Sequence, residues 1–237
     1  MTSSVVISIR TYLTEKSSKK TREGFQNFFK EKVEFHGVKS AVVAKIGRHH
    51  FRQVNKISKR KMWLVCEELL SSGLFEESMI AFAWADKLHE SFEESDFSVL
   101  ERWLRKFVTN WAACDALCNH AVGSFVDAFP LYVEKLKSWA RSQNRWLRRA
   151  AAVTLILPAR KGRFLSDIFE IADILLEDKE DLVQKGYGWM LKEASKLHQQ
   201  EVFEYVVRNR SRMPRTALRY AIEKMPADFR KKAREKG

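Results

Sequence analysis

Trp111 and Asp115 are the residues whose types and spacing most directly suggest chemistry in this chain. They stand four positions apart, and on a helix residues i and i+4 share one face. One helical turn would therefore present a wide aromatic surface beside a carboxylate. The alternative is a structural aspartate paired with a neighbouring arginine, and the residues alone leave both interpretations open.

Two later segments add basic and aromatic groups. Trp146 is followed by Arg148 and Arg149, and an arginine fork suits a phosphate, although one of the two arginines is expected to be an exposed helix charge. Two glycines precede Trp189 inside a helical pattern, at a cost of about 1 kcal/mol each relative to alanine. They favour the close approach of a nucleic-acid backbone or, alternatively, tight helix packing over a core tryptophan. A basic protein with tryptophan, carboxylate and arginine side chains on successive helices is predicted to have a site that binds a sugar–phosphate chain.

A metal centre or a bound cofactor is not expected. Cys114, Cys118 and His120 lie close together, but they lack a fourth ligand and the loop spacing of zinc sites. The chain has no phosphate-cradling glycine loop, Gly-x-Ser-x-Gly motif or His-Glu-x-x-His motif. Several enzyme classes are thereby excluded, and we expect no metal and no cofactor.

The formal net charge of +13 is unevenly distributed. Eight Lys or Arg and no acidic residue occur between Lys39 and Lys61, whereas ten acidic residues and one lysine occur between Glu67 and Glu101. From Glu201 onward, eleven Lys or Arg oppose five Asp or Glu. A basic face suits a polyanionic ligand, because neutralised phosphates release their counterions. Chance clustering on solvated helices is the alternative.

The composition is that of an ordinary folded protein. Its 237 residues are 45% apolar and 31% charged, which supports a substantial core. No apolar run approaches the ~20 residues of a membrane span, and no basic region precedes the short N-terminal apolar run, so we expect neither a membrane segment nor a signal peptide. Three cysteines fit a reducing compartment, and we expect a cytoplasmic protein.

Apolar residues recur at helical spacing almost throughout, which predicts an all-α protein. The spacing of Trp103 and Trp111 is nearly repeated by Trp139 and Trp146 about 35 residues later. Two helices in each unit of about 35–45 residues are typical of HEAT-like or armadillo-type repeats. We predict a curved solenoid of about six antiparallel helix pairs forming one domain over 1–226, then a frayed basic tail over 227–237. Helices are expected near 2–16, 18–31, 40–54, 58–72, 75–89, 93–106, 109–128, 131–142, 145–157, 162–177, 180–195, 199–210 and 214–224.

Several segments, in order and at matching separations, resemble those of the AlkD-type alkylpurine DNA glycosylases, a HEAT-like-repeat DNA alkylation repair family. The resemblance spans nearly the whole chain. It rests on the segment 35–40 (FHGVKS), on Trp111 with Asp115, on 142–150 (SQNRWLRRA) and on 183–193 (VQKGYGWMLKE).

The resemblance implies that Asp115 is the catalytic carboxylate and that Trp111 and Trp189 contact the deoxyribose of the damaged nucleotide. Alkylation at N3 or N7 gives a purine a positive charge and makes it a good leaving group, so little general acid catalysis is needed. An ionised carboxylate stabilises an oxocarbenium-like sugar and orients a water. Tryptophan faces also favour a cationic sugar.

The resemblance also implies phosphate contacts. Arg149 matches the arginine that holds the DNA backbone, with Arg148 the weaker candidate, and Lys192 is a further basic position near the second tryptophan. The chain departs from the family pattern at Phe28, where a tyrosine is expected, and at Lys39, where an uncharged polar residue is expected. Both lie in the N-terminal region expected to face DNA, so the departures bear on lesion preference.

The leading hypothesis is a monofunctional alkylpurine DNA glycosylase that acts as a monomer on double-stranded DNA containing 7-methylguanine or 3-methyladenine. A second hypothesis is a DNA-structure-binding relative that has lost turnover. A third is a HEAT-type protein-binding scaffold, which would need an apolar or mixed groove in place of the segregated positive charge.

Overall fold

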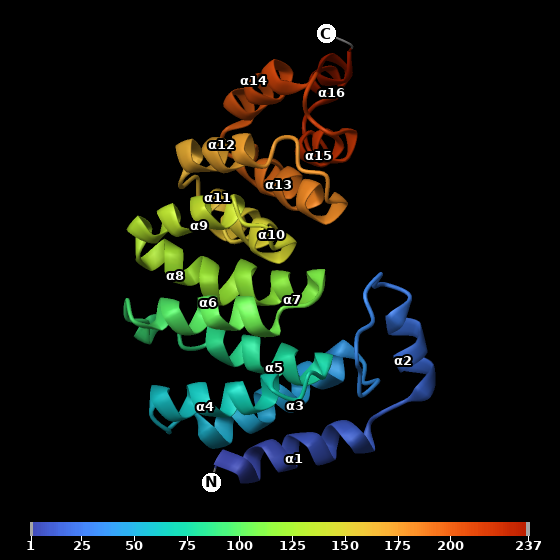
Figure 1. The fold of residues 1–237 in the computed structure, drawn as a ribbon, viewed down its shortest axis with the longest axis vertical. Helices are drawn as coiled ribbons and strands as arrows, with labels where there is room; N and C mark the ends of the chain where they lie inside the picture. The colour runs from blue at the N-terminus through green and yellow to red at the C-terminus, as the bar shows by residue number, and fades with distance from the viewer. Residues whose placement is uncertain (1, 236–237) are drawn as a thin grey trace. The chain divides into compact units, whose positions relative to one another are not determined.

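The computed structural model describes residues 2–235, and side chains from residue 4 onward. Within these residues the chain is helical, and β pairing is limited to one isolated bridge between Glu34 and Leu74 (Figure 1). The all-α prediction is confirmed. None of the described helices is long and apolar enough to cross a membrane.

Contacts divide the chain into two compact units, Met1–Leu117 and Cys118–Gly237, and each is described by itself. A π-helical turn, Leu117–Val122, contains the boundary. The helices of the first unit are α1 (Thr2–Glu15), α2 (Lys19–Gln26), α3 (Ser40–Val54), α4 (Lys59–Leu70), α5 (Phe75–Asp86), η1 (His89–Ser91), α6 (Asp96–Phe107) and α7 (Trp111–Ala116). Those of the second are α8 (Gly123–Ala128), η3 (Pro130–Tyr132), α9 (Val133–Ala140), α10 (Arg145–Val153), α11 (Ile156–Arg160), α12 (Leu165–Ile174), α13 (Asp181–Ala194), α14 (Gln199–Asn209), α15 (Arg215–Ala221) and α16 (Ala227–Arg234).

The helical repeat is visible in the bonds that join successive layers. In the first unit, Trp84 Nε1 donates to the Gly47 carbonyl, 37 residues away, and Trp103 Nε1 donates to Glu67, 36 residues away. In the second unit, Arg160 pairs with Glu193 across 33 residues. Groups one period apart therefore meet on neighbouring layers, as a helical repeat requires. The division of residues 1–226 into a single domain and about six pairs stays a prediction.

Local sequence fixes where the helices that carry the candidate residues begin. Asn110 caps α7, its side chain accepting a hydrogen bond from Ala113 N at 2.9 Å. Asn144 caps α10 in the same way, accepting from Trp146 N at 2.8 Å. Each asparagine satisfies a backbone donor that a helix start leaves unpaired, and so sets the register of the residues that follow.

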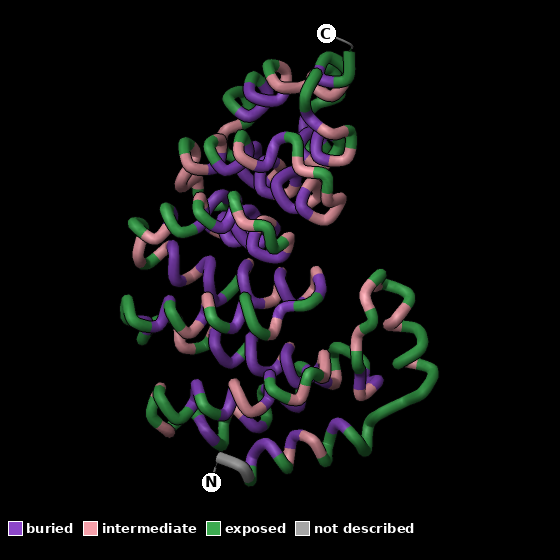
Figure 2. Tube along the Cα trace, viewed as in Figure 1, coloured by how far each residue is buried: buried purple, intermediate pink, exposed green. Residues whose placement is uncertain are grey.

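In each unit, buried residues alternate with exposed ones along the helices (Figure 2), and the buried residues are mostly apolar. Trp84, Trp103 and Phe82 are fully buried in the first unit, and Tyr187 and Phe125 in the second. Aromatic burial of this size supplies much of the apolar area that stabilises the fold.

Three expected elements differ from the structure. The helix expected over 18–31 ends at Gln26, because the Gln26 side chain donates to the Glu31 carbonyl and accepts from Val33 N, which favours a turn. The helix expected over 109–128 is interrupted by the π turn. The helix expected over 145–157 ends at Val153. Pro158 lies in the first turn of α11, where proline is tolerated.

The frayed tail expected over 227–237 is wrong for residues 227–234, and residues 236–237 lie outside the described part of the chain. Residues Ala227–Arg234 form α16, which packs against α14. Phe229 contacts Phe203 with ring centroids 4.2 Å apart, and Ala233 is buried. A few apolar residues in a basic segment are enough to dock it as a helix.

The two glycines before Trp189 have different roles. A Cβ at Gly188 would lie 2.7 Å from both the Ala217 carbonyl oxygen and Tyr220 Cβ, so this glycine lets α13 pack tightly on α15. The nearest atom to a Cβ at Gly186 is Arg149 Cγ, at an ordinary 3.5 Å. Tight helix packing, the alternative left open by the sequence, is therefore confirmed at Gly188.

We predict that Gly188→Ala lowers the free energy of unfolding by about 1–3 kcal/mol, because α13 and α15 must move apart. Gly186→Ala is the matched control on the same helix and is expected to be neutral or to stabilise by up to about 1 kcal/mol. Urea denaturation of both variants measures the difference. Equal stability of the two variants would contradict this account of the packing.

Candidate nucleic-acid interface

Two of the seven tryptophans differ from the rest in exposure. Five are at most 8% exposed and belong to the core: Trp63, Trp84, Trp103, Trp139 and Trp146. Trp111 and Trp189 alone are half-exposed. An indole that stays partly exposed on a folded protein is a candidate for contact with a ligand.

Trp111 and Asp115 both lie in α7, a short helix of the first unit. Both are half-exposed, whereas Ala113 and Cys114 between them are buried. The predicted shared face is therefore present, with an aromatic ring one turn before a carboxylate. The π-helical turn follows directly after α7, and such wide turns are frequent at functional sites.

The Trp111 ring is held by the segment that follows α2. Its Nε1 donates to the Phe28 carbonyl at 3.3 Å, and its ring stacks on Phe29 with centroids 5.6 Å apart and planes inclined by 22°. Phe29 in turn contacts Phe35 and Phe75. The indole is thus fixed on one side by an aromatic cluster.

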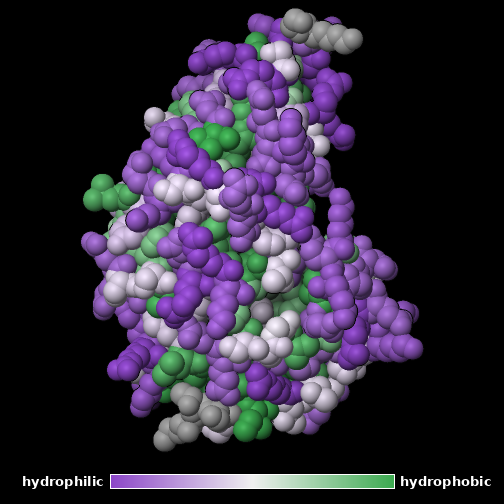
Figure 3. Space-filling model, viewed as in Figure 1, coloured by the Kyte–Doolittle hydropathy of each residue, from purple (hydrophilic) through white to green (hydrophobic). Residues whose placement is uncertain are grey.

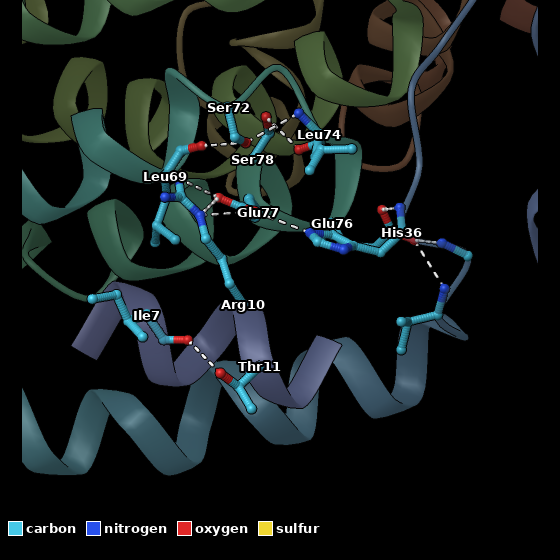
Figure 4. Close-up of polar contacts among 12 residues, drawn as sticks. Ile7, Arg10, Thr11, His36, Leu69, Ser72, Leu74, Glu76, Glu77 and Ser78 are labelled. Atoms are coloured by element: carbon cyan, nitrogen blue, oxygen red, sulfur yellow. Dashed lines mark hydrogen bonds and ion pairs between the residues drawn. The ribbon is translucent and has the colours of Figure 1, made fainter. Parts of the chain in front are cut away.

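A buried carboxylate anchors that segment to α5 (Figure 4). Glu76 is 1% exposed and accepts hydrogen bonds from the backbone N–H groups of His36, Gly37 and Val38 at 2.8–2.9 Å. Gly37 has φ +88°, and a Cβ there would lie 2.6 Å from the Ser18 carbonyl oxygen, so only glycine fits.

The neighbouring Glu77 forms a second anchor. Its side chain is fully buried and lies 3.0 Å from both Arg10 Nε and His36 Nε2. Burial alone would raise the pKa of Glu77, but the hydrogen bonds from His36 and Arg10 and the charge of Arg10 outweigh it and lower the pKa. Glu77 therefore stays ionised as a structural group and does not exchange protons near neutral pH.

Arg149 lies in the second unit and is 5% exposed. Its guanidinium donates to the Leu182 carbonyl, and its side chain runs beside Gly186 of α13. A Cβ at Gly186 would be in ordinary van der Waals contact with this side chain, so the position of Arg149 does not depend on the glycine.

Arg148 has a different setting from its neighbour. Its Nε donates to Asp178 at 2.6 Å, and its Nη1 donates to the carbonyls of Ser142 and Gln143 at 3.0 Å. These bonds tie α10 to the chain before it and to the segment before α13, which favours a structural role. Neither arginine is the freely exposed helix charge expected for one of the pair.

Trp189 is oriented by a carboxylate that the sequence analysis did not single out. Its Nε1 donates to Glu193 at 3.1 Å, and Glu193 is 4% exposed and also bonds to Arg160 at 2.7 Å and Lys196 at 2.5 Å. Burial alone would raise the pKa of Glu193, but the hydrogen bonds from Arg160, Lys196 and Trp189 lower it to about 2. The i, i+4 spacing of Trp189 and Glu193 was the signal that could have revealed this pair.

Lys192 is less available than the sequence suggested. Its Nζ lies 3.1 Å from Glu223 and 5.6 Å from the Tyr220 ring centroid, and 15% of its side chain is exposed. The hydrogen bond from Lys192, together with its charge, lowers the pKa of Glu223. A phosphate at Lys192 would therefore compete with an existing carboxylate.

The basic stretch Lys39–Lys61 runs along α3 into α4. Among the residues described, Lys59 alone of its eight cations has a carboxylate partner, pairing with Glu93 and Asp96. Lys39 is exposed at the start of α3, and Phe28 is 71% exposed. Uncompensated charge of this kind supports the expected affinity for a polyanion.

The candidate residues thus fall into two groups. Trp111 and Asp115 share α7 in the first unit, whereas the arginines on α10 and Trp189 with Lys192 on α13 belong to helices that pack together in the second. The three cysteines are buried and form no disulfide, and the described residues contain no cluster of three His, Cys, Asp or Glu that could hold a metal.

Comparison with known proteins identifies the family. The family model described as "DNA alkylation repair enzyme" matches residues 9–225. The chain belongs to this family. Among solved structures, a predicted DNA alkylation repair enzyme from Enterococcus faecalis is similar at 17% identity and a TM-score of 0.80, over 90% of this chain and 98% of that one. The similarity shows a shared fold. A search of curated proteins found no match.

We predict that Glu76→Ala lowers the free energy of unfolding by about 2–4 kcal/mol, because buried backbone N–H groups lose their acceptor. Hydrogen exchange at residues 36–38 should accelerate strongly. The control is Glu90→Ala, which removes an exposed carboxylate from the same unit and should change neither. Unchanged exchange in Glu76→Ala would show that the segment is held by other contacts.

Proposed function

We propose that this member of the DNA alkylation repair family is a monofunctional DNA glycosylase for cationic alkylated purines such as 7-methylguanine and 3-methyladenine. The observation that carries the proposal is the half-exposed pair of Trp111 and Asp115 on one helical turn. The pair offers an electron-rich surface and an anion at the same place, which together suit a sugar that develops positive charge.

The chemistry needs few groups. The C1′–N9 bond breaks with its electrons leaving to the purine, whose positive charge is thereby neutralised, so no protein acid has to protonate it. Asp115 faces the developing oxocarbenium ion and accepts a proton from the water that adds to C1′. The products are the free base and an abasic site, which places the protein in base excision repair.

The remaining candidates bind the nucleotide. Trp189, oriented by Glu193, contacts the deoxyribose. Arg149 meets the DNA backbone and Lys192 is a weaker phosphate contact, because Glu223 already compensates its charge. These contacts carry affinity for double-stranded DNA without reading its sequence. The proposed fold subtype is a HEAT-like repeat, and the proposed working state is a monomer without a cofactor.

We predict that the protein releases 7-methylguanine from duplex DNA but leaves hypoxanthine, a neutral purine, in place, because the mechanism relies on the charge of the leaving base. Base release measured by chromatography compares the two duplexes. Release of both bases at similar rates would indicate a general acid and contradict the mechanism. Duplex binding with release of neither would favour a non-catalytic DNA-binding protein instead.

A further inference from the structure

Four arginines gather at the C-terminal end of the second unit. A cavity of about 480 Å³ between α13, α15 and α16 is lined by Arg219, Arg230 and Arg234 among others. A second hollow, of about 310 Å³, is lined by Arg215, Leu218, Arg219 and Arg234. Arg230 and Arg234 also line a third, of about 390 Å³. The shared arginines make these hollows one surface, the arginine cluster, defined by residues 215, 219, 230 and 234.

The charges around the cluster are not balanced. The first cavity also contains Asp181 and Glu223, but Asp181 pairs with Lys185 at 2.7 Å and Glu223 pairs with Lys192 at 3.1 Å. Glu235 lines the third hollow, yet among residues 2–235 no arginine of the cluster forms an ion pair. Asp181 and Glu223 are therefore neutralised by lysines, and the four arginines outnumber the one remaining carboxylate, Glu235.

One atom of the cluster lacks an acceptor. Arg230 Nε is buried and has no hydrogen-bond partner. Leaving a charged donor unsatisfied costs free energy, which an anion in the cavity would recover. Thr216 and Tyr220 supply further hydroxyl groups to the lining. Figure 3 shows hydrophilic residues over α15 and α16 on the face turned to the viewer.

The cluster adjoins the candidate residues on α13. Lys192 lies over the Tyr220 ring and pairs with Glu223, and both Tyr220 and Glu223 line the first cavity. A strand that passes Trp189 and Lys192 therefore reaches the arginine cluster within the same unit.

We propose that the arginine cluster binds backbone phosphodiesters of the DNA duplex beyond the damaged nucleotide. This inference rests on the proposed function and names a second contact region for the same substrate. Arginine suits it because its planar fork pairs with phosphate oxygens through two hydrogen bonds. The site adds affinity and leaves lesion choice unchanged.

The test measures binding of a short undamaged duplex as a function of salt. Arg219→Gln combined with Arg234→Gln removes two exposed charges, and the slope of log K against log salt should fall by about 1–2. At low salt we expect roughly tenfold weaker binding. Arg230→Gln, with stability checked by thermal unfolding, should lower the slope by about 1. Arg141→Gln, an exposed arginine after α9, is the control and should change neither quantity.

An unchanged slope in both cluster variants would overturn the proposal. A thermal shift by inorganic phosphate, compared with chloride at equal ionic strength, separates a small-anion site from a DNA site. Stabilisation by phosphate that the variants abolish, with an unchanged duplex slope, would also overturn it. Because the duplex is undamaged, the outcome is independent of catalysis: absent base release with a reduced slope would refute the glycosylase and leave the cluster standing.

Discussion

The carboxylate of Glu76 is the constraint on which the candidate site of the first unit depends. It gathers three consecutive backbone N–H groups in a buried position, which fixes the segment after α2 against α5. That segment presents Phe29 and the Phe28 carbonyl to the Trp111 indole. Without the anchor, the indole would lose the partners that hold its ring beside Asp115.

In the second unit, a different carboxylate positions the half-exposed tryptophan. Glu193 is buried, kept ionised by Arg160 and Lys196, and accepts the Trp189 indole N–H. In both units a buried, fully bonded glutamate positions, directly or through a loop, a tryptophan that stays half-exposed. Preorganisation of this kind removes side-chain entropy before a ligand arrives, so binding and catalysis do not have to supply it.

Much of the fold followed from the sequence, because helical periodicity and short connections are local signals. The shared face of Trp111 and Asp115 was also predictable, since it depends only on i, i+4 spacing. The contacts of Trp111 with Phe28 and Phe29 were not, because they join residues 83 and 82 positions apart through a loop. The α16 helix was missed because its few apolar residues are hidden among basic ones. The pairing of Arg148 with Asp178 was not predictable either, because tertiary packing brings the two residues together and no local sequence pattern indicates it.

The central claim is that the ionised carboxylate of Asp115 stabilises the developing sugar cation and accepts the proton of the water. It is tested most directly by the single-turnover rate of 7-methylguanine release by Asp115→Asn, with the protein in excess over duplex. The account predicts a rate at least about a hundredfold below wild type, with duplex affinity retained. A rate within a few-fold of wild type would contradict it.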